Sequence, residues 1–330
     1  AARRWFGARQ TALAYTLPTG PVKRYSARAR CSIIGALDTI VIKGGVALTG
    51  TVSTGGAKNS ALPLLFATLL ADGEHRFHNV PRLMDIDSTA VLLNHLHCAV
   101  RREDGSLVVE VSDCGGSDAP YDIVRKMRAS ILCLGPLLTR YGRARVSLPG
   151  GCAIGTRPVN LHIEALRQMG AEIDIEGGYV NARAERLHGA CIVFENATVG
   201  GTENLMLAAV LAEGTTVLEN AAKEPEIVDL AAYLCKMGAR IEGAGSSVIT
   251  IDGVERLHPA EHTVIPDRIE AGTLLIAGAI TGGDVTVRWR PTCLSGRETT
   301  SATSCVLASR AERVGKAKAG VPKKTVFIDA

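Results

Sequence analysis

The feature that most constrains the fold is an internal repeat of roughly 70 residues. Gly73 and Gly214 are each followed six residues later by Asn and thirteen residues later by Ile. An apolar tail of related sequence then occurs three times, reading L-x-x-L-H-C-A-V from Leu93, L-x-x-M-G-A-E-I from Leu166 and L-x-x-M-G-A-R-I from Leu234. Because each unit mixes helical and strand periodicity, the repeat predicts an α/β domain built from three copies.

Hydrophobic spacing places the expected elements within each unit. It predicts helices over residues 60–70, 87–96, 123–138, 160–169, 203–212, 225–237 and 269–280. It predicts strands at 40–42, 46–52, 75–78, near 100, and at 107–111, 145–148, 172–175, 179–182, 216–219, 240–242, 248–251 and 285–287. A fourth unit begins at Ile269, but its pattern ends at about Arg288. The apolar side chains of the helix at 269–280, such as Leu274, Leu275 and Ile276, are therefore expected to be exposed.

The first 37 residues differ in charge from the rest. They hold seven basic residues, and no acidic residue precedes Asp38. This composition is typical of an organellar transit peptide, with a flexible basic tail or translated sequence upstream of the true start as alternatives. The basic charge does not continue into the rest of the chain, as it would in a nucleic-acid-binding protein, and no apolar run reaches the roughly 18 residues of a membrane span. We therefore expect neither a nucleic acid nor a membrane as partner.

The nine cysteines are scattered along the chain without a Cys-x-x-Cys pair. This spacing argues against a zinc site and favours a reducing compartment. The sequence suggests no metal or organic cofactor. We expect a cytoplasmic location, with an organelle as the alternative.

Residues 148–162, which read L-P-G-G-C-A-I-G-T-R-P-V-N-L-H, form the first candidate site. Three glycines leave the backbone free for close approach of a ligand, and Cys152 and Arg157 stand among them. A guanidinium near a thiol lowers the pKa of the thiol and can bind a phosphate or carboxylate. The segment therefore predicts a reactive loop, and the alternative is a glycine turn with an inert buried cysteine.

A second candidate site lies where Gly55 and Gly56 precede Lys58 and Asn59 at an expected helix N-terminus. Free backbone N–H groups together with a Lys and an Asn suit a phosphate or carboxylate. The alternative is an ordinary capped helix with a solvated lysine.

Five motifs in order resemble the enolpyruvyl transferase family, and within it the UDP-N-acetylglucosamine 1-carboxyvinyltransferases. They are Lys58-Asn59, P-Y-D-I-V-R-K-M-R-A-S at 120–130, the Cys152 loop, L-A-E-G-T-T-V-L-E-N-A-A-K-E-P-E-I-V-D at 211–229 and P-D-R-I-E-A-G-T at 266–273. The resemblance runs from about residue 39 to residue 288. It implies an inside-out α/β barrel of repeated βαβαββ units, in which two such domains hold phosphoenolpyruvate and the nucleotide sugar between them.

The resemblance also implies a domain plan. Residues 58–265 are expected to form one complete three-repeat domain, and residues 39–57 with 266–288 a fragment of the second domain. Residues 1–38 are expected to be a disordered basic extension, and residues 289–330 a divergent, disordered tail. The family's second domain supplies an Asp that deprotonates the sugar hydroxyl, and an Asp and an Arg at the phosphoenolpyruvate end of the cleft. None of these has a match, so the chain resembles a truncated member.

Site residues follow from the same resemblance. Cys152 matches the reactive thiol that acts as general acid on the enolpyruvate methylene carbon. Lys58 and Arg157 match groups that bind the phosphate and carboxylate of phosphoenolpyruvate, and Asn59 and Arg128 match residues that position the ligands. Two segments match contacts to the uridine nucleotide, namely Arg157, Pro158, Val159, Asn160 and Leu161, and Thr198, Val199 and Gly200.

The implied activity is transfer of the enolpyruvyl group from phosphoenolpyruvate to the 3-hydroxyl of UDP-N-acetylglucosamine, the first committed step of peptidoglycan synthesis. A non-catalytic remnant that binds the nucleotide sugar or anions without turnover is the alternative. The related 3-phosphoshikimate transferases match less well, because the Gly-Gly-Cys loop belongs to the nucleotide-sugar branch. The oligomeric state is not indicated by the sequence.

Overall fold

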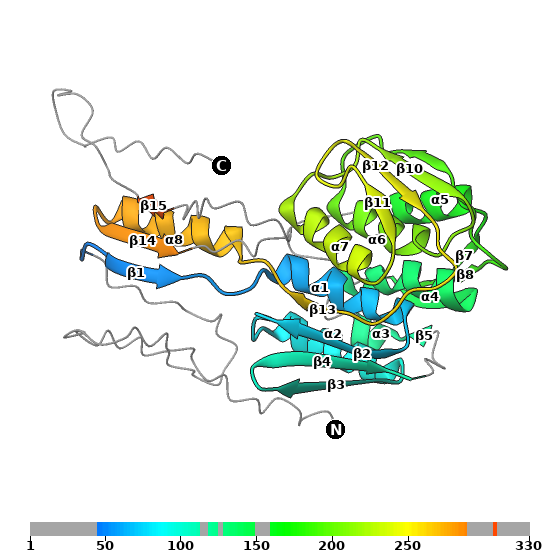
Figure 1. The fold of residues 1–330 in the computed structure, drawn as a ribbon, viewed down its shortest axis with the longest axis horizontal. Coiled ribbons are helices and arrows are strands. Elements are labelled where there is room, and N and C mark those ends of the chain that lie inside the picture. The colour runs from blue at the N-terminus through cyan, green and yellow to red at the C-terminus, as the bar shows by residue number, and fades with distance from the viewer. Residues whose placement is uncertain (1–44, 113–117, 125–127, 149–158, 289–305, 309–330) are drawn as a thin grey trace, which may run out of the picture. The chain divides into compact units, whose positions relative to one another are not determined.

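The computed structural model describes residues 45–112, 118–124, 128–148, 159–288 and 306–308 (Figure 1). The chain divides into two compact units. The larger contains residues 53–273 and the smaller residues 45–52 and 274–287, and each also holds part of the C-terminal region. Residues 1–38, the expected basic extension, lie outside the described residues. The expected tail at 289–330 also lies outside them, apart from residues 306–308. The expected domain limits of 58–265 stay a prediction.

Three four-stranded sheets make up the larger unit, one from each repeat. The first has the order β13 (Glu261–Thr263), β2 (Gly73–His78), β4 (Ser106–Val111), β3 (Cys98–Glu103). The second has the order β5 (Asp118–Ala119), β6 (Arg143–Ser147), β8 (Tyr179–Arg183), β7 (Glu172–Glu176). The third has the order β9 (Cys191–Val193), β10 (Thr215–Glu219), β12 (Val248–Asp252), β11 (Arg240–Glu242). In every sheet the first pair is parallel and the other two pairs are antiparallel.

Strand β13 closes the ring of repeats. It follows the third repeat in sequence but pairs in parallel with β2 of the first, with His262 opposite Phe77. The first repeat thus receives its first strand from the end of the domain. The ends of the larger unit are therefore tied together by backbone hydrogen bonds.

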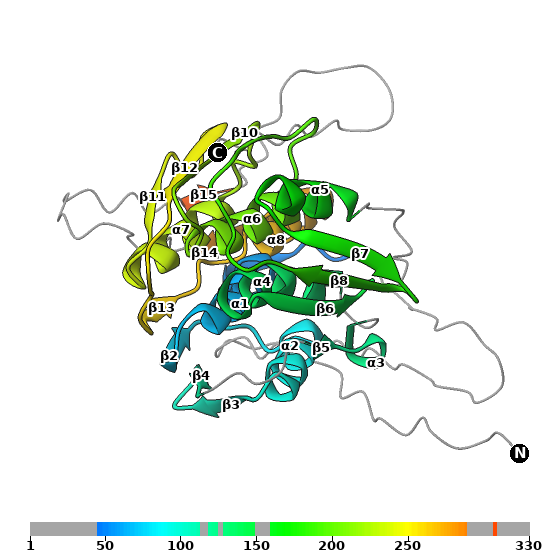
Figure 2. The ribbon, with the colours of Figure 1, turned by 90° about the vertical axis from the view of Figure 1, so that its right-hand side faces the viewer.

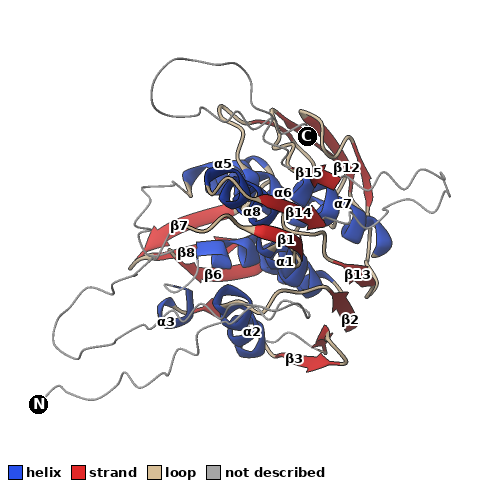
Figure 3. Ribbon diagram, turned by 90° about the vertical axis from the view of Figure 1, so that its left-hand side faces the viewer, coloured by secondary structure: helices blue, strands red, loops and turns tan. Residues whose placement is uncertain are grey.

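The first helix of each repeat is buried on nearly all sides between the sheets (Figures 2 and 3). These helices are α1 (Lys58–Ala67), α4 (Leu134–Tyr141) and α6 (Val199–Ala209). Helix α1 continues as the 3₁₀ turn η1 (Thr68–Leu70), and α4 follows the 3₁₀ segment η2 (Arg128–Cys133). The second helices bury one face, as their mixed composition predicts; they are α2 (Met84–His95), α5 (Asn160–Gln168) and α7 (Pro225–Lys236).

The repeated Gly and Asn of the sequence bound the second strand of a sheet. Gly73 and Gly214 have φ of 117° and 86°, and Asn79 and Asn220 have φ of 57° and 54°. The Asn79 side chain donates to the Val264 carbonyl at 3.0 Å, and Asn220 makes the equivalent bond to Phe194 at 2.9 Å. Each pair therefore supplies a left-handed turn and a tie to the neighbouring parallel strand.

The repeated tail ends the second helix of each unit. Its Gly170 and Gly238 take left-handed conformations with φ of 93° and 106°, as expected for the residue that follows a helix. His97 takes the same position after α2 with φ of 69°. The preceding apolar residues, Leu96 and Met169 among them, are fully buried, so the tail anchors each helix end in the core.

The smaller unit contains a sheet of order β1-β14-β15 and the end of α8 (Arg268–Ile280). The strands are β1 (Thr49–Ser53), β14 (Asp284–Arg288) and β15 (Val306–Ala308). Leu275 is 3% exposed and Ile276 51% exposed, so the expectation of an exposed helix is wrong for Leu275. Leu275 and Ala279 lie one turn apart and are buried, as are Val285 and Val287 at alternate strand positions, so this unit has a small core of its own.

Most expected elements are present, with three differences. The expected helix at 123–138 is divided into α3 (Tyr121–Val124), η2 and α4, with residues 125–127 outside the described part. The short first strands β5, β9 and β13 were not expected. The expected strand at 46–52 appears as β1, with residues 45–48 not in a strand, and the expected strand at 40–42 lies outside the described range. Among the described helices, none is long and apolar enough to cross a membrane.

Candidate substrate site

Three helix N-termini carry the predicted substrate residues that the structure describes. Lys58 and Asn59 begin α1, Asn160 and Leu161 begin α5 after the N-cap Val159, and Val199 and Gly200 begin α6 after the N-cap Thr198. The first turn of a helix presents backbone N–H groups without intrahelical partners, and these favour phosphate and carboxylate. Cys152, Arg157 and Pro158 lie outside the described residues; Arg128 begins η2, but its side chain lies outside them.

The two segments predicted to contact the nucleotide are neighbours in space. A Cβ placed on Gly200 would lie 3.6 Å from Cε1 of His162, which is two residues beyond Asn160. The Thr198 hydroxyl oxygen accepts a hydrogen bond from the Gly201 N–H at 3.3 Å and so caps α6. The structure therefore brings together the N-termini of α5 and α6, which are far apart in sequence.

A buried amide fixes His162 behind these N-termini. Asn204 on α6 accepts from the Gly135 N–H at 2.8 Å, so its nitrogen must be the atom 3.0 Å from His162 Nδ1. The same nitrogen donates to the Ile131 carbonyl at 3.1 Å. Because an amide nitrogen only donates, His162 Nδ1 is an acceptor, which assigns the tautomer. The network joins α5, α6, η2 and α4, and no sequence motif predicted it.

Lys58 is held by an exchangeable ion pair. Its Nζ lies 2.9 Å from Oδ2 of Asp85 in the first turn of α2, and the two side chains are 39% and 35% exposed. Pairs with this exposure contribute at most about 1 kcal/mol to stability. An anionic ligand can therefore compete with Asp85 for the ammonium group. Asn59 is exposed beside it.

Acidic side chains lie near the start of α7. Glu203 on α6 is 4% exposed, and its pKa is raised well above the ordinary value by burial and then by the charges of Glu226 and Glu224. Glu226 is itself buried and accepts from Arg268 Nε at 2.9 Å. This group was not predictable from the sequence, because a Glu inside a helix usually lies in solvent.

Comparison with known proteins decides the family. The model of the EPSP synthase (3-phosphoshikimate 1-carboxyvinyltransferase) family matches residues 42–300. The chain belongs to this family. UDP-N-acetylglucosamine 1-carboxyvinyltransferases of Bdellovibrio bacteriovorus and Nitratidesulfovibrio vulgaris (strain DP4) are 60% and 57% identical to it over 248 and 249 residues, or 75% and 76% of this chain. The chain spans 60% of the length of each.

Solved structures of family members share the fold. The enolpyruvyl transferase NikO from Streptomyces tendae superposes with a TM-score of 0.66 at 25% identity, covering 74% of this chain and 58% of that one. An EPSP synthase from Acinetobacter baumannii gives 0.60 at 19% identity, covering 74% and 56%. The expected fold class, the enolpyruvyl-transferase barrel of repeated units, is confirmed.

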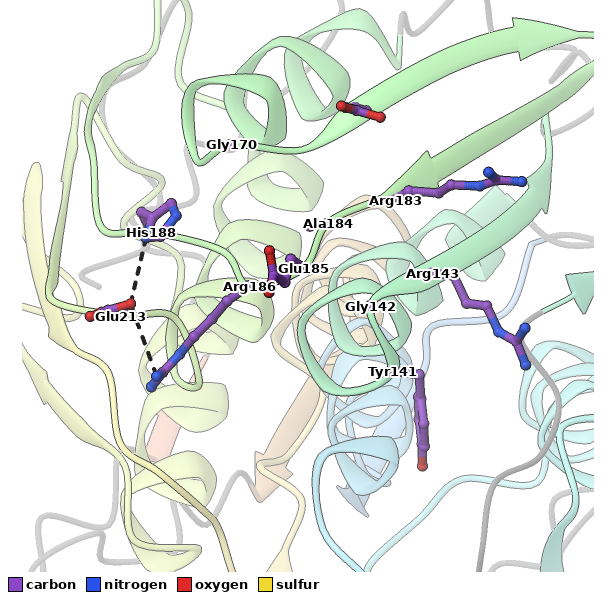
Figure 4. A pocket seen from close by; sticks show the side chains of 11 residues that line it. Tyr141, Gly142, Arg143, Gly170, Arg183, Ala184, Glu185, Arg186, His188 and Glu213 are labelled. Atoms are coloured by element: carbon purple, nitrogen blue, oxygen red, sulfur yellow. Dashed lines mark ion pairs between the residues drawn. The ribbon is translucent and has the colours of Figure 1, made fainter.

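A hollow of the described family domain lies at the other ends of its helices (Figure 4). It measures about 970 Å³ and is lined by Gly142 and Gly170, the residues that follow α4 and α5. Its cations are largely balanced by acids, with Glu213 lying 4.0 Å from Arg186 and 3.8 Å from His188. None of the predicted site residues that the structure describes lines it. This hollow is therefore not the substrate site that the helix N-termini indicate.

In the described part of the chain, no group of three or more His, Cys, Asp or Glu side chains is arranged to hold a metal ion. What the described site does offer is a set of backbone N–H groups, one lysine and amide side chains. Such a set binds and orients anions and can stabilise negative charge that develops during a reaction.

Proposed function

We propose that this family member transfers the enolpyruvyl group of phosphoenolpyruvate to the 3-hydroxyl of UDP-N-acetylglucosamine, with release of phosphate. The observation that carries the proposal is the 60% identity to a relative named UDP-N-acetylglucosamine 1-carboxyvinyltransferase, over a stretch that includes the Cys152 loop. The neighbouring N-termini of α5 and α6, which suit a diphosphate, support it.

The residue roles are part of the proposal. Lys58 and Arg157 bind the phosphate and carboxylate of phosphoenolpyruvate, while Asn59 and Arg128 position the two substrates. The segment from Arg157 to Leu161 and the residues Thr198, Val199 and Gly200 contact the uridine nucleotide. Cys152 donates a proton to the methylene carbon, which makes the adjacent carbon electrophilic toward the sugar hydroxyl. The hydroxyl proton is lost as the C–O bond forms, and loss of phosphate and of one methyl proton then restores the double bond.

The biological setting follows from the reaction. The enolpyruvyl ether is the entry to peptidoglycan synthesis, so the protein would act in the cytoplasm in cell wall biogenesis, on which cell shape, the cell cycle and cell division depend. Phosphoenolpyruvate and the nucleotide sugar would be its partners.

Phosphate release tests the proposal. The full chain is mixed with phosphoenolpyruvate and UDP-N-acetylglucosamine, and inorganic phosphate is measured with time. We expect release that needs both substrates, is lost in Cys152→Ala and does not occur with shikimate 3-phosphate as acceptor. Binding of UDP-N-acetylglucosamine without phosphate release would support the non-catalytic alternative, and release with shikimate 3-phosphate would contradict the assigned acceptor.

A further inference from the structure

A fully buried carboxylate lies close to the start of α1. Asp229 on α7 is 0% exposed. Its Oδ2 accepts a short hydrogen bond from the Ser60 hydroxyl and a second bond from the Ile265 N–H at 3.3 Å, while Oδ1 lies 2.8 Å from His262 Nε2. One carboxylate thus contacts α1, the closing strand β13 and the residue two positions beyond that strand.

A buried carboxylate is not the most stabilising way to fill this space. Burying a carboxylate costs several kcal/mol, and well-packed apolar residues in place of a buried ion pair are often neutral or stabilising. The contacts of Asp229 instead specify orientation, because each of its three donors has a fixed direction. The donors come from segments that are 169, 36 and 33 residues away in sequence.

Those contacts enclose the candidate anion-binding residues. On one side of Lys58 and Asn59, the Ala57 N–H donates to the Ile265 carbonyl at 2.7 Å. On the other side, Ser60 donates to Asp229, which also binds the N–H of Ile265. Both anchors of this short segment therefore lead to Ile265 and Asp229.

The preceding backbone leaves no room for adjustment. A Cβ at Gly56 would lie 1.7 Å from the Asn79 carbonyl oxygen, and Gly56 also bridges to Pro266. The chain thus enters α1 through a tightly packed turn. Once Asp229 fixes Ser60, the direction of the first turn of α1 is determined on both sides.

We propose that Asp229 is a positioning residue that, through Ser60, holds the first turn of α1 so that Lys58 and Asn59 face the anionic substrate. The proposal rests on the proposed function, since it takes phosphoenolpyruvate as the ligand of Lys58. The role of Asp229 is indirect: it touches Ser60, Ile265 and His262, and the lysine does the binding.

Protection of Lys58 from acetylation tests this role. The full chain is treated with an acetylating reagent at increasing concentrations of phosphoenolpyruvate, and acetyl-Lys58 is measured by mass spectrometry. The phosphoenolpyruvate concentration that halves labelling is compared between variants. Ser60→Ala removes the bond to Asp229 and is expected to raise that concentration about fivefold, the equivalent of one hydrogen bond of about 1 kcal/mol.

Two matched variants separate positioning from loss of stability. Thr68→Val removes another buried hydroxyl, which donates to the Leu65 carbonyl at 2.7 Å in the turn that follows α1. It is expected to lower the unfolding midpoint yet leave the half-protecting concentration within twofold of wild type. Ser60→Thr keeps the hydroxyl and is expected to restore most of the protection that Ser60→Ala loses.

The outcomes distinguish the two proposals. Equal protection in wild type and Ser60→Ala would overturn the positioning role while leaving the function in place. An equal loss in Ser60→Ala and Thr68→Val would also overturn it, because a general loss of stability would then explain both. Absence of protection by phosphoenolpyruvate in the folded wild-type chain would overturn the assignment of this ligand to Lys58 and the positioning role with it.

Discussion

The larger unit contains two helix–helix junctions, here called seams, that are held together by polar groups of different chemistry. Where α5 meets α6, the neutral amide of Asn204 binds His162 and two backbone groups. Where α7 meets α1, the carboxylate of Asp229 binds a hydroxyl, an imidazole and a backbone N–H. The first seam joins consecutive repeats, and the second closes the ring. The comparison suggests that the ring closure uses charge to fix its geometry, while the internal seam needs only neutral hydrogen bonds.

A second imidazole makes the closing seam still more polar. His75 Nδ1 lies 2.6 Å from the Tyr233 hydroxyl, and Nε2 lies 3.1 Å from the Ala71 carbonyl. Burial lowers the pKa of His75 to about 4, with the bond to Ala71 opposing that shift. Neutral His75 donates from Nε2 to the carbonyl and accepts from the tyrosine, so the uncharged form fits its surroundings.

The largest expected effect comes from removing the charge of the closing seam. Asp229→Ala leaves Ser60, Ile265 and His262 without their acceptor and opens a cavity. We expect a loss of about 3 to 5 kcal/mol in the free energy of unfolding, measured by urea denaturation of the full chain. Asn204→Ala in the other seam is expected to lose about 1 to 3 kcal/mol. A larger loss in Asn204→Ala than in Asp229→Ala would break the comparison.

The next effect is the pH dependence of the closing seam. The pKa of His75 is lower in the folded state than its ordinary 6.5, so the unfolded state binds more protons below pH 6.5. Stability from this group is therefore complete above pH 6.5 and falls as the pH drops toward 4. At pH 5 the loss is about 2 kcal/mol relative to pH 7.

Urea unfolding at pH 7 and pH 5 measures that loss. His75→Gln, which cannot take up a proton, is expected to reduce the difference between the two pH values by about 2 kcal/mol. An unchanged difference would show that the acid sensitivity of the domain arises elsewhere.

A smaller effect tests whether the repeats share one backbone design. His97 is exposed and takes the left-handed position that Gly170 and Gly238 take in the other repeats. His97→Gly is expected to raise the free energy of unfolding by about 0.5 to 1 kcal/mol, and Gly238→Ala to lower it by about 1 kcal/mol. A loss of stability in His97→Gly would indicate that its side chain, rather than the backbone turn, matters there.

The smallest effect concerns the exposed pair beside the closing seam. Asp85→Asn removes the partner of Lys58 and is expected to change the free energy of unfolding by less than about 1 kcal/mol. Because Lys58 then has one competitor fewer, less phosphoenolpyruvate should protect it from acetylation. Weaker protection would contradict the view that Asp85 competes with the substrate.

Local patterns in the sequence predicted the parts of the fold that have local causes. The Gly73 and Asn79 pair was visible because left-handed conformations restrict residue type. The second helices were visible because their buried residues recur every turn. The two-residue strand β5 has too few residues to show a period, and the burial of Leu275 does not follow from its helical spacing alone.

The candidate site was predictable only in part for the same reason. Lys58 and Asn160 stand at helix starts, as expected, whereas Thr198 caps a helix that begins four residues earlier than the predicted start at residue 203. Asp229 lies within the quoted 211–229 motif, but its role was not visible, because its partner Ser60 is 169 residues away and the contact exists only when the ring closes. Long-range polar contacts of this kind leave no periodic trace in a single sequence.

Competitive alkylation of the cysteines tests most directly whether the loop at 148–162 and the helix N-termini form one site around a reactive thiol. Burial raises the pKa of Cys133 and also that of Cys235, so both are poor nucleophiles. With limiting iodoacetamide and mass spectrometry of the full chain, we predict that Cys152 is labelled first and is protected by phosphoenolpyruvate with UDP-N-acetylglucosamine. Faster labelling of Cys133 or Cys235 than of Cys152 would contradict the account.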